Sequence, residues 1–213
     1  MSADRAIAPV GLGFRALKGG SVVVGVAADG GEPRVVLSSF LATAAEGDRL
    51  ALEPYHVAAG MERGPHGGPS AEAEAAVAEG RRRQDELAAA GLEDVLAKLR
   101  KARSEPVVAA LLVNRAGWVS DLLAYSLAFV DHPPVAEGLA VRDALRFAFG
   151  RCGIHAVEVD EKTLHEIASK ELHLGSPEID IRLKALGATA GRPWRKEQKL
   201  ACLAAWVAVA ARQ

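Results

Sequence analysis

Three apolar runs near the N-terminus, joined by short links that contain glycine, constrain the fold more than any other feature. The first run covers residues 10–16, the second begins at Ser21 ("SVVVGVAAD"), and the third begins at Glu32 ("EPRVVLSSFLA"). Gly19-Gly20 and Asp29-Gly30-Gly31 separate them. Valine-rich runs of this length indicate β-strands, and tight glycine-bearing links are typical of hairpins. The sequence therefore predicts an antiparallel three-stranded meander.

Helical and strand-like segments alternate after the meander. Residues 43–70 are expected to be mostly irregular, and a long helix is expected from Ala71 to about Arg103, interrupted or kinked at Gly91. One face of that helix carries Leu92, Val95, Leu96 and Leu99. "PVVAALLVN", from Pro106, is a continuous apolar run typical of a strand buried on both faces, as in a parallel sheet.

The C-terminal half continues the alternation. After a break at His132-Pro133-Pro134, a helix with Val141, Leu145 and Phe149 on one face precedes a short final strand in "RCGIHAVEVD". We expect Asp160 to cap the next helix, with Glu161 in its first turn, and Ser176-Pro177 to start another. The last helix, roughly residues 196–212, is apolar on nearly every side and should be buried. Together these elements predict an α/β protein with a mixed five-stranded sheet, three strands antiparallel and two parallel, flanked by helices.

Composition narrows the classes of protein to consider. The chain has 213 residues, a formal net charge of -1 and two cysteines, Cys152 and Cys202. These values do not favour a disulfide framework or a structural zinc site, and they do not mark a nucleic-acid binder unless charge gathers on one face. No apolar run is long enough to span a membrane, and residues 1–10 lack the pattern of a secretory signal. We expect a cytoplasmic protein from a GC-rich bacterial genome, because Ala, Arg and Gly are abundant and Asn is scarce.

The segment "LGFRALKGGSVVVGV" carries a resemblance to a known family. It has Leu12-Gly13-Phe14, a polar position at Arg15, Gly19 or Gly20, and then a Val-rich strand. With the order of elements, this pattern resembles the ribonuclease-H-like fold, and within it the Holliday-junction resolvase branch, in which the first strand typically has Asp at the polar position. The resemblance implies one domain over residues 1–213, with the sheet and its covering helices in 1–160 and a helical C-terminal part in 161–213.

The resemblance also implies where a site should lie. Active members of that superfamily bind two divalent metals through carboxylates of the first strand, the fourth strand and the last helix. The matching positions here are Arg15, Asn114 and Glu197, of which only the last is a carboxylate. Two cations about 4 Å apart need several hard oxygen ligands, and a guanidinium repels Mg²⁺. We therefore expect no cofactor and no enzyme, but a catalytically degenerate module that binds nucleic acid or a protein partner.

An alternative stays open at this point. A metal-dependent nuclease could use relocated ligands, with Glu197, Asp121 and Asp160 binding Mg²⁺ or Mn²⁺ as the catalytic acids. A third hypothesis is self-association into a homo-oligomer through a sheet edge or an apolar helix face. No set of residues with the spacing of another hydrolase or of a phosphate-binding loop is present.

The candidate ligand-binding residues are cationic or polar side chains expected around this cleft, namely Arg15, Lys18, His56, Asn114, Arg115, Lys196 and Lys199. Arg15 could bind a phosphate, but an ion pair with an acid such as Glu197 is favoured, because an unpaired buried charge is too costly. For His56, packing or capping is favoured over a role as a base or phosphate contact. Asn114, Arg115 and Asp121 lie at or after a strand end, where both ligand binding and turn or cap roles remain open.

The long helix is basic in two places. Arg81-Arg82-Arg83 form the first, and the second contains Lys98, Arg100, Lys101 and Arg103. Acidic residues are interleaved with them, so a solvated, ion-paired helix is favoured over a surface for nucleic acid. Trp194 is expected to pack the last helix onto the sheet.

Overall fold

The computed structural model describes residues 7–29, 32–114, 119–129 and 133–212 of the protein. Its strands are β1 (Ala8–Leu17), β2 (Gly20–Asp29), β3 (Glu32–Ala42), β4 (Ser104–Val113) and β5 (Ala156–Asp160). Its helices are α1 (Arg49–Leu52), α2 (Pro54–Ala59), α3 (Ala71–Lys101), α4 (Leu122–Ala128), α5 (Pro133–Cys152), α6 (Leu164–Leu172), α7 (Ser176–Ala190) and α8 (Lys196–Ala210).

The five strands form one mixed sheet in the order β3-β2-β1-β4-β5. β1, β2 and β3 pair antiparallel, whereas β4 runs parallel to both β1 and β5. This arrangement confirms the predicted meander and the two parallel strands. It also places β1 in the middle of the sheet, with a neighbour on each side.

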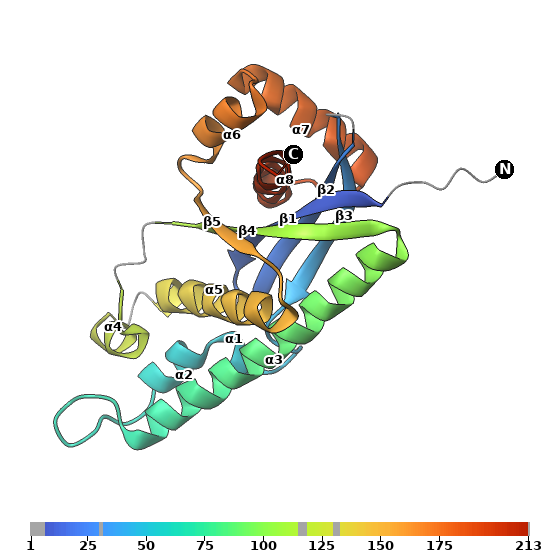
Figure 1. Ribbon diagram of the computed structural model, residues 1–213. Helices are drawn as coiled ribbons and strands as arrows, with labels where there is room; N and C mark the ends of the chain where they lie inside the picture. Colours follow the sequence, from blue (N-terminus) through green and yellow to red (C-terminus); the bar gives the residue numbers. More distant parts are fainter. Residues whose placement is uncertain (1–6, 30–31, 115–118, 130–132, 213) are drawn as a thin grey trace.

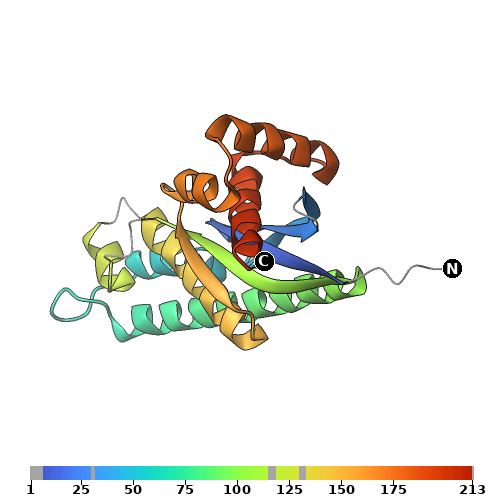
Figure 2. The same cartoon turned by 45° about the horizontal axis from the view of Figure 1, so that its top comes forward.

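Helices cover both faces of the sheet (Figure 1). Helices α6, α7 and α8 lie on one face, and α3 and α5, with the shorter α1, α2 and α4, lie on the other. The turned view in Figure 2 shows the same three layers, with α3 running along the full length of its face. No helix among the described residues has the length and apolar character needed to cross a membrane.

Each face has its own hydrophobic core. The core on the α8 face includes Val24, Ala110 and Leu203, and the core on the α3 face includes Phe14, Leu92 and Leu145. The predicted apolar faces of α3 and α5 are buried in the second core, and residues 200–209 of α8 are all buried. These predictions are confirmed.

Helix α8 rests directly on β1, because two glycines remove the side chains that would separate them. A Cβ atom on Gly13 would lie 1.8 Å from the carbonyl oxygen of Ala201, and one on Gly11 would lie 2.2 Å from that of Ala205. Ala201 and Ala205 are one helical turn apart, and the glycines are two strand positions apart, so the same face of each element is in contact. The helix therefore runs antiparallel to β1, and its first turn lies over the next residue on this face, Arg15.

Residues 43–70 are mostly irregular, as predicted, and contain two short helices, α1 and α2. Two other local predictions were wrong. Helix α3 continues through Gly91 without the predicted interruption. The position faces Leu41, whose Cγ would lie 3.1 Å from a Cβ there. The helix after β5 begins at Leu164 with Thr163 at its N-cap, not after Asp160.

Candidate functional site

Arg15 lies on the central strand, on the sheet face that α8 covers. It pairs with Val22 of β2 and with Leu112 of β4, close to the carboxyl ends of the parallel strands. Its side chain is largely buried, with 19% of its surface exposed. A guanidinium in such a place needs acidic partners.

Two glutamates supply those partners from distant parts of the chain. The Nε and Nη2 atoms of Arg15 donate to Oε2 and Oε1 of Glu161, at 3.0 and 3.1 Å. The Nη1 atom lies 3.6 Å from Oε1 of Glu197, in the first turn of α8. The bidentate geometry makes Glu161 the closer partner. The ion pair with Glu197 that the sequence favoured is present, although it is the weaker of the two contacts.

Glu161 reaches Arg15 because it continues the pairing of the last strand. Its backbone N–H donates to the carbonyl oxygen of Val113, at 2.9 Å, so the residue stays beside β4 instead of entering a helix. Asp160 turns the chain there, with its Oδ1 accepting from the N–H of Lys162. Asp160 is thus a turn residue, and Glu161 belongs to the carboxyl edge of the sheet.

The residues at this edge do not fit a pair of divalent cations. The two carboxylates converge on a guanidinium, which neutralises them and fills the space between them. Among the described residues, no three His, Cys, Asp or Glu side chains come together as a metal-binding group. Glu197, Asp121 and Asp160, the acids of the nuclease alternative, are all described and do not form such a group. Asp121 instead caps α4 by accepting from the N–H of Ala124.

A second polar cluster lies beyond the end of β4, around a pocket of about 720 Å³. Oδ1 of Asn114 accepts from Nη1 of Arg142 at 2.8 Å, and burial lowers the pKa of that guanidinium. Arg146 bridges Asp143 and Glu158, with contacts of 2.7 and 2.6 Å. Cationic and acidic side chains alternate around this pocket, so it has little net charge. Arg115 lies outside the described residues.

Lys18 and His56 are not brought to the Arg15 site. Lys18 forms an ion pair with Glu53, and its hydrogen bond lowers the pKa of that carboxyl. His56 is exposed on α2, and its backbone N–H donates to Oε1 of Glu137 at 2.8 Å. Burial raises the pKa of Glu137 to about 7. This group stabilises the start of α2 and has no contact with Arg15.

The segment that leads into α8 is strongly basic. Residues 192–199 contain Arg192, Arg195, Lys196 and Lys199 against the single acid Glu197. All four cations are exposed, and none takes part in an ion pair within the described ranges. Because Glu197 already faces Arg15, the positive charge of this segment is uncompensated. Two of the predicted ligand-binding residues, Lys196 and Lys199, belong to it. Trp194 packs between α7 and the start of α8, with its indole N–H donating to the carbonyl of Leu183.

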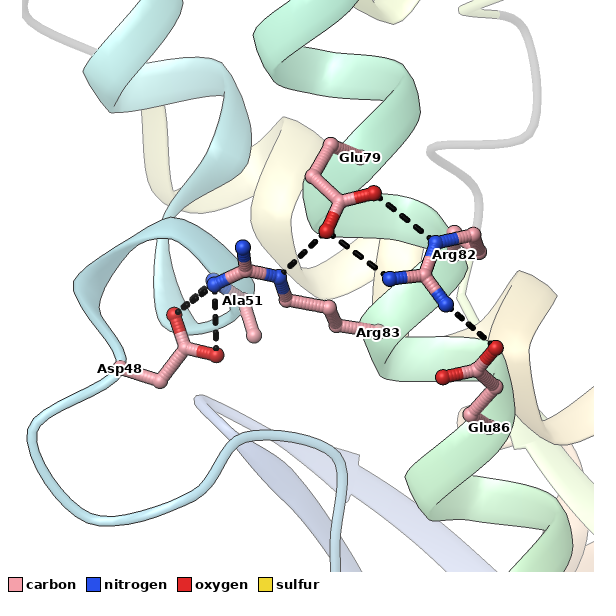
Figure 3. A network of polar contacts seen from close by, with 6 residues as sticks. All are labelled: Asp48, Ala51, Glu79, Arg82, Arg83 and Glu86. Carbon is pink, nitrogen blue, oxygen red and sulfur yellow. Dashed lines mark hydrogen bonds and ion pairs between the residues drawn. The ribbon is translucent and has the colours of Figure 1, made fainter.

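In contrast to the cations of segment 192–199, arginines of α3 form ion pairs with nearby acids (Figure 3). Arg82 contacts Glu79 and Glu86, and Arg83 contacts Glu79 and Asp48. Hydrogen bonds from Arg82 and Arg83 lower the pKa of Glu79 to about 2. Arg81 contacts Tyr55 and Asp143. The prediction of an ion-paired helix is confirmed for these three residues.

The sheet order and the helix layers define an α/β fold of the ribonuclease-H-like type. Comparison with solved structures identifies the arrangement more closely. The structure of RuvC from Thermus thermophilus aligns with a TM-score of 0.53 and 13% sequence identity, covering 95% of each chain. The same protein in complex with a Holliday junction substrate aligns at 0.52 and 12%, covering 95% of this chain and 94% of that one. The predicted fold is thereby confirmed.

Sequence comparison adds nothing to this similarity. No protein-family model matches the chain, and no curated protein matches its sequence.

Sequence reasoning did not identify Glu161 and Arg142 as parts of this edge. A signal for Glu161 was present, because it directly follows a short strand, and the carboxyl ends of parallel strands meet at one edge of a sheet. Its position beside Asp160 suggested a helix start instead. Arg142 carried no such signal, since it lies in mid-helix and reaches Asn114 only through the packing of α5 on the sheet.

Proposed function

We propose that this protein is a ribonuclease-H-like module that binds nucleic acid and does not cleave it by metal-dependent chemistry. The observation that carries the proposal is the guanidinium of Arg15 held between Glu161 and Glu197. A fixed protein cation balances the two acids where a catalytic member of the fold needs acids free to bind metal. The fold neighbour solved with a Holliday junction substrate supports nucleic acid as the class of ligand.

The basic segment 192–199 provides the electrostatic side of the proposal. Its four exposed cations, Arg192, Arg195, Lys196 and Lys199, lie close in the chain to Glu197, which contacts Arg15. Neutralising phosphates with such side chains releases condensed counterions, so affinity falls as salt rises. Paired cations such as Arg82 cannot contribute equally, because they would first have to leave their acids.

Fluorescence anisotropy with labelled single-stranded, duplex and four-way-junction oligonucleotides, over a salt series, tests this proposal. We expect binding, and a slope of log affinity against log salt that becomes shallower by about 1 to 2 in the double variant Lys196→Gln/Lys199→Gln. The matched control is Lys98→Gln/Lys101→Gln, which removes two exposed lysines with the same spacing from α3. The control should behave as the wild type. Absence of salt-dependent binding to every oligonucleotide would overturn the proposal and favour a protein partner.

Incubation of the same oligonucleotides with Mg²⁺ or Mn²⁺ tests the catalytic part. We expect no cleavage by the wild type. Metal-dependent cleavage that disappears in Glu197→Gln would show that the nuclease alternative is correct.

A further inference from the structure

A pocket of about 510 Å³ lies between the edge strand β3 and the start of α8, next to the Arg15 site. Phe40, Ser38, Val22, Leu17 and Arg195 contribute to its wall, and Glu197 is shared with the site already described. Its volume lies within the usual range for small-ligand sites. The pocket wall therefore combines apolar side chains and serine hydroxyl groups with one cation, Arg195, and one carboxylate, Glu197.

Phe40 is the notable member of this pocket, because 52% of a large aromatic side chain is exposed. A Cβ on Gly20 would lie 2.7 Å from Cζ and 2.8 Å from Cε1 of the Phe40 ring. The ring thus lies over the backbone of Gly20, and the absence of a side chain at that position gives it room. It is supported from the sheet while much of its surface faces solvent.

The register of the sheet aligns this ring with the Arg15 site. Phe40 pairs with Val22, and Val22 pairs with Arg15 on its other side. The three residues form one row across adjacent strands and share a face. Since neighbouring strands lie about 4.8 Å apart, the backbones of Phe40 and Arg15 are about 10 Å apart.

The charge around the ring selects the class of ligand. Arg195 contributes to the pocket wall, Lys196 and Lys199 follow it, and no ion pair occupies any of them within the described residues. An aromatic ring with serine hydroxyls and Arg195 in one pocket, and Lys196 and Lys199 close by in the chain, matches a nucleotide, in which a planar base is joined to a phosphate. The bases of a duplex are already stacked and paired, so only an unpaired base can use the ring.

We propose that the Phe40 pocket binds an unpaired nucleotide of a single-stranded or locally opened nucleic acid, with the base stacked on Phe40 and a phosphate near Arg195. This inference rests on the proposed function and deepens it by naming the form of nucleic acid that this face recognises. In this arrangement the bound nucleic-acid strand runs from the basic segment 192–199 across the edge strand β3.

A double-mutant cycle between protein and oligonucleotide provides the test. Binding of a short single-stranded DNA, and of the same DNA with abasic sites, is measured for the wild type, Phe40→Ala, Phe40→Leu and Phe40→Trp. We expect Phe40→Ala and Phe40→Leu to weaken binding of the intact strand about tenfold. Phe40→Trp should retain it. Abasic DNA should bind the wild type as weakly as intact DNA binds Phe40→Ala, with no further loss when the two changes are combined.

Phe147→Ala is the matched control. Phe147 is 43% exposed and lies on α5, on the opposite side of the sheet (Figure 1), so this variant should bind as the wild type does. Thermal unfolding of each variant verifies that Phe40→Ala remains folded.

The outcomes separate this inference from the proposed function. Equal binding by wild type and Phe40→Ala, with the salt effect of Lys196→Gln/Lys199→Gln retained, would overturn the Phe40 pocket and leave nucleic-acid binding intact. Preference for duplex over single strands, independent of Phe40, would do the same. A dimer that Phe40→Ala converts to monomer would show that a second copy covers the ring, and would also overturn the inference. No binding to any oligonucleotide would remove both proposals.

Discussion

The two faces of the sheet are covered by helices in different ways, and they handle charge differently. On one face α8 rests on the bare backbone of β1, and the basic segment at its start has one acid for four cations. On the other face α3 and α5 pack through side chains, and Arg81, Arg82 and Arg83 are all paired. A count of arginines and lysines does not reveal this difference. The difference teaches that pairing with acids, which only the folded chain shows, distinguishes the cations of segment 192–199 from Arg81, Arg82 and Arg83.

The largest effect on stability is expected at Gly13, where the backbone of β1 contacts the backbone of α8. Gly13→Ala places a Cβ 1.8 Å from the carbonyl oxygen of Ala201, so α8 must move away from the sheet. We expect the free energy of unfolding to fall by about 4 kcal/mol or more, because a helix backbone cannot yield as a side chain does. Urea denaturation followed by circular dichroism measures the change.

Gly91→Ala is the matched substitution on the other face. Its Cβ meets Cγ of Leu41 at 3.1 Å, a side chain that can shift, and alanine favours the helix. We expect a change within about 1 kcal/mol in either direction. Equal losses for the two variants would contradict the distinction between backbone and side-chain packing of the two faces.

The next effect is a pH dependence confined to the α3 and α5 face. Burial raises the pKa of Glu137 from 4.5 to about 7, so the folded protein holds this proton more tightly than the unfolded chain does. The stabilisation is complete below pH 4.5 and is lost as pH rises through about 7. The free energy of unfolding of Glu137→Gln should therefore equal that of the wild type at about pH 4.5. At about pH 8 it should exceed the wild-type value by about 3 kcal/mol.

Urea titrations across this pH range check the result. Glu93→Gln removes an exposed glutamate of α3 and serves as the control, with a pH profile expected to follow the wild type. A Glu137→Gln profile parallel to that of the wild type would show that Glu137 is not the group responsible.

A smaller effect on stability is expected from replacing one arginine on each face of the sheet, Arg15 on the α8 face and Arg83 on the α3 face. Arg15→Met leaves Glu161 and Glu197 facing each other with 27% and 30% of their side chains exposed. We expect a loss of about 2 kcal/mol in unfolding free energy, partly restored by adding Glu161→Gln. Arg83→Met, whose side chain is 39% exposed, should cause no resolvable loss. If both single variants lose the same amount, the Arg15 cluster is an ordinary surface ion pair.

Several elements of the fold were predictable because their signals are local. Valine-rich runs joined by glycine-bearing links located the meander, and a continuous apolar run located β4. Helical spacing of apolar residues located the buried faces of α3 and α5. The apolar run of α8 predicted its burial, and the odd position of Arg15 in β1 predicted an acidic partner. The predicted start of α6 was wrong. Asp160 has the chemistry of a helix cap, but Glu161 pairs with Val113 of β4, and that contact cannot be read from the local sequence.

Residues of the candidate site were harder to predict, because their contacts join parts of the chain that are far apart in sequence. Glu161 is separated from Arg15 by 146 positions, and no local pattern links them. Phe40 looked like any apolar strand residue, because its exposure follows from β3 being an edge strand beside the start of α8.

The sequence by itself determined the order of strands and helices and placed a cation on the central strand, since hydrophobic periodicity acts over a few residues. The tertiary structure decided which acids neutralise that cation, which cations stay free and which aromatic ring stays exposed. These outcomes depend on strand register and on the approach of α8 to Gly11 and Gly13, which bring together residues far apart in the chain.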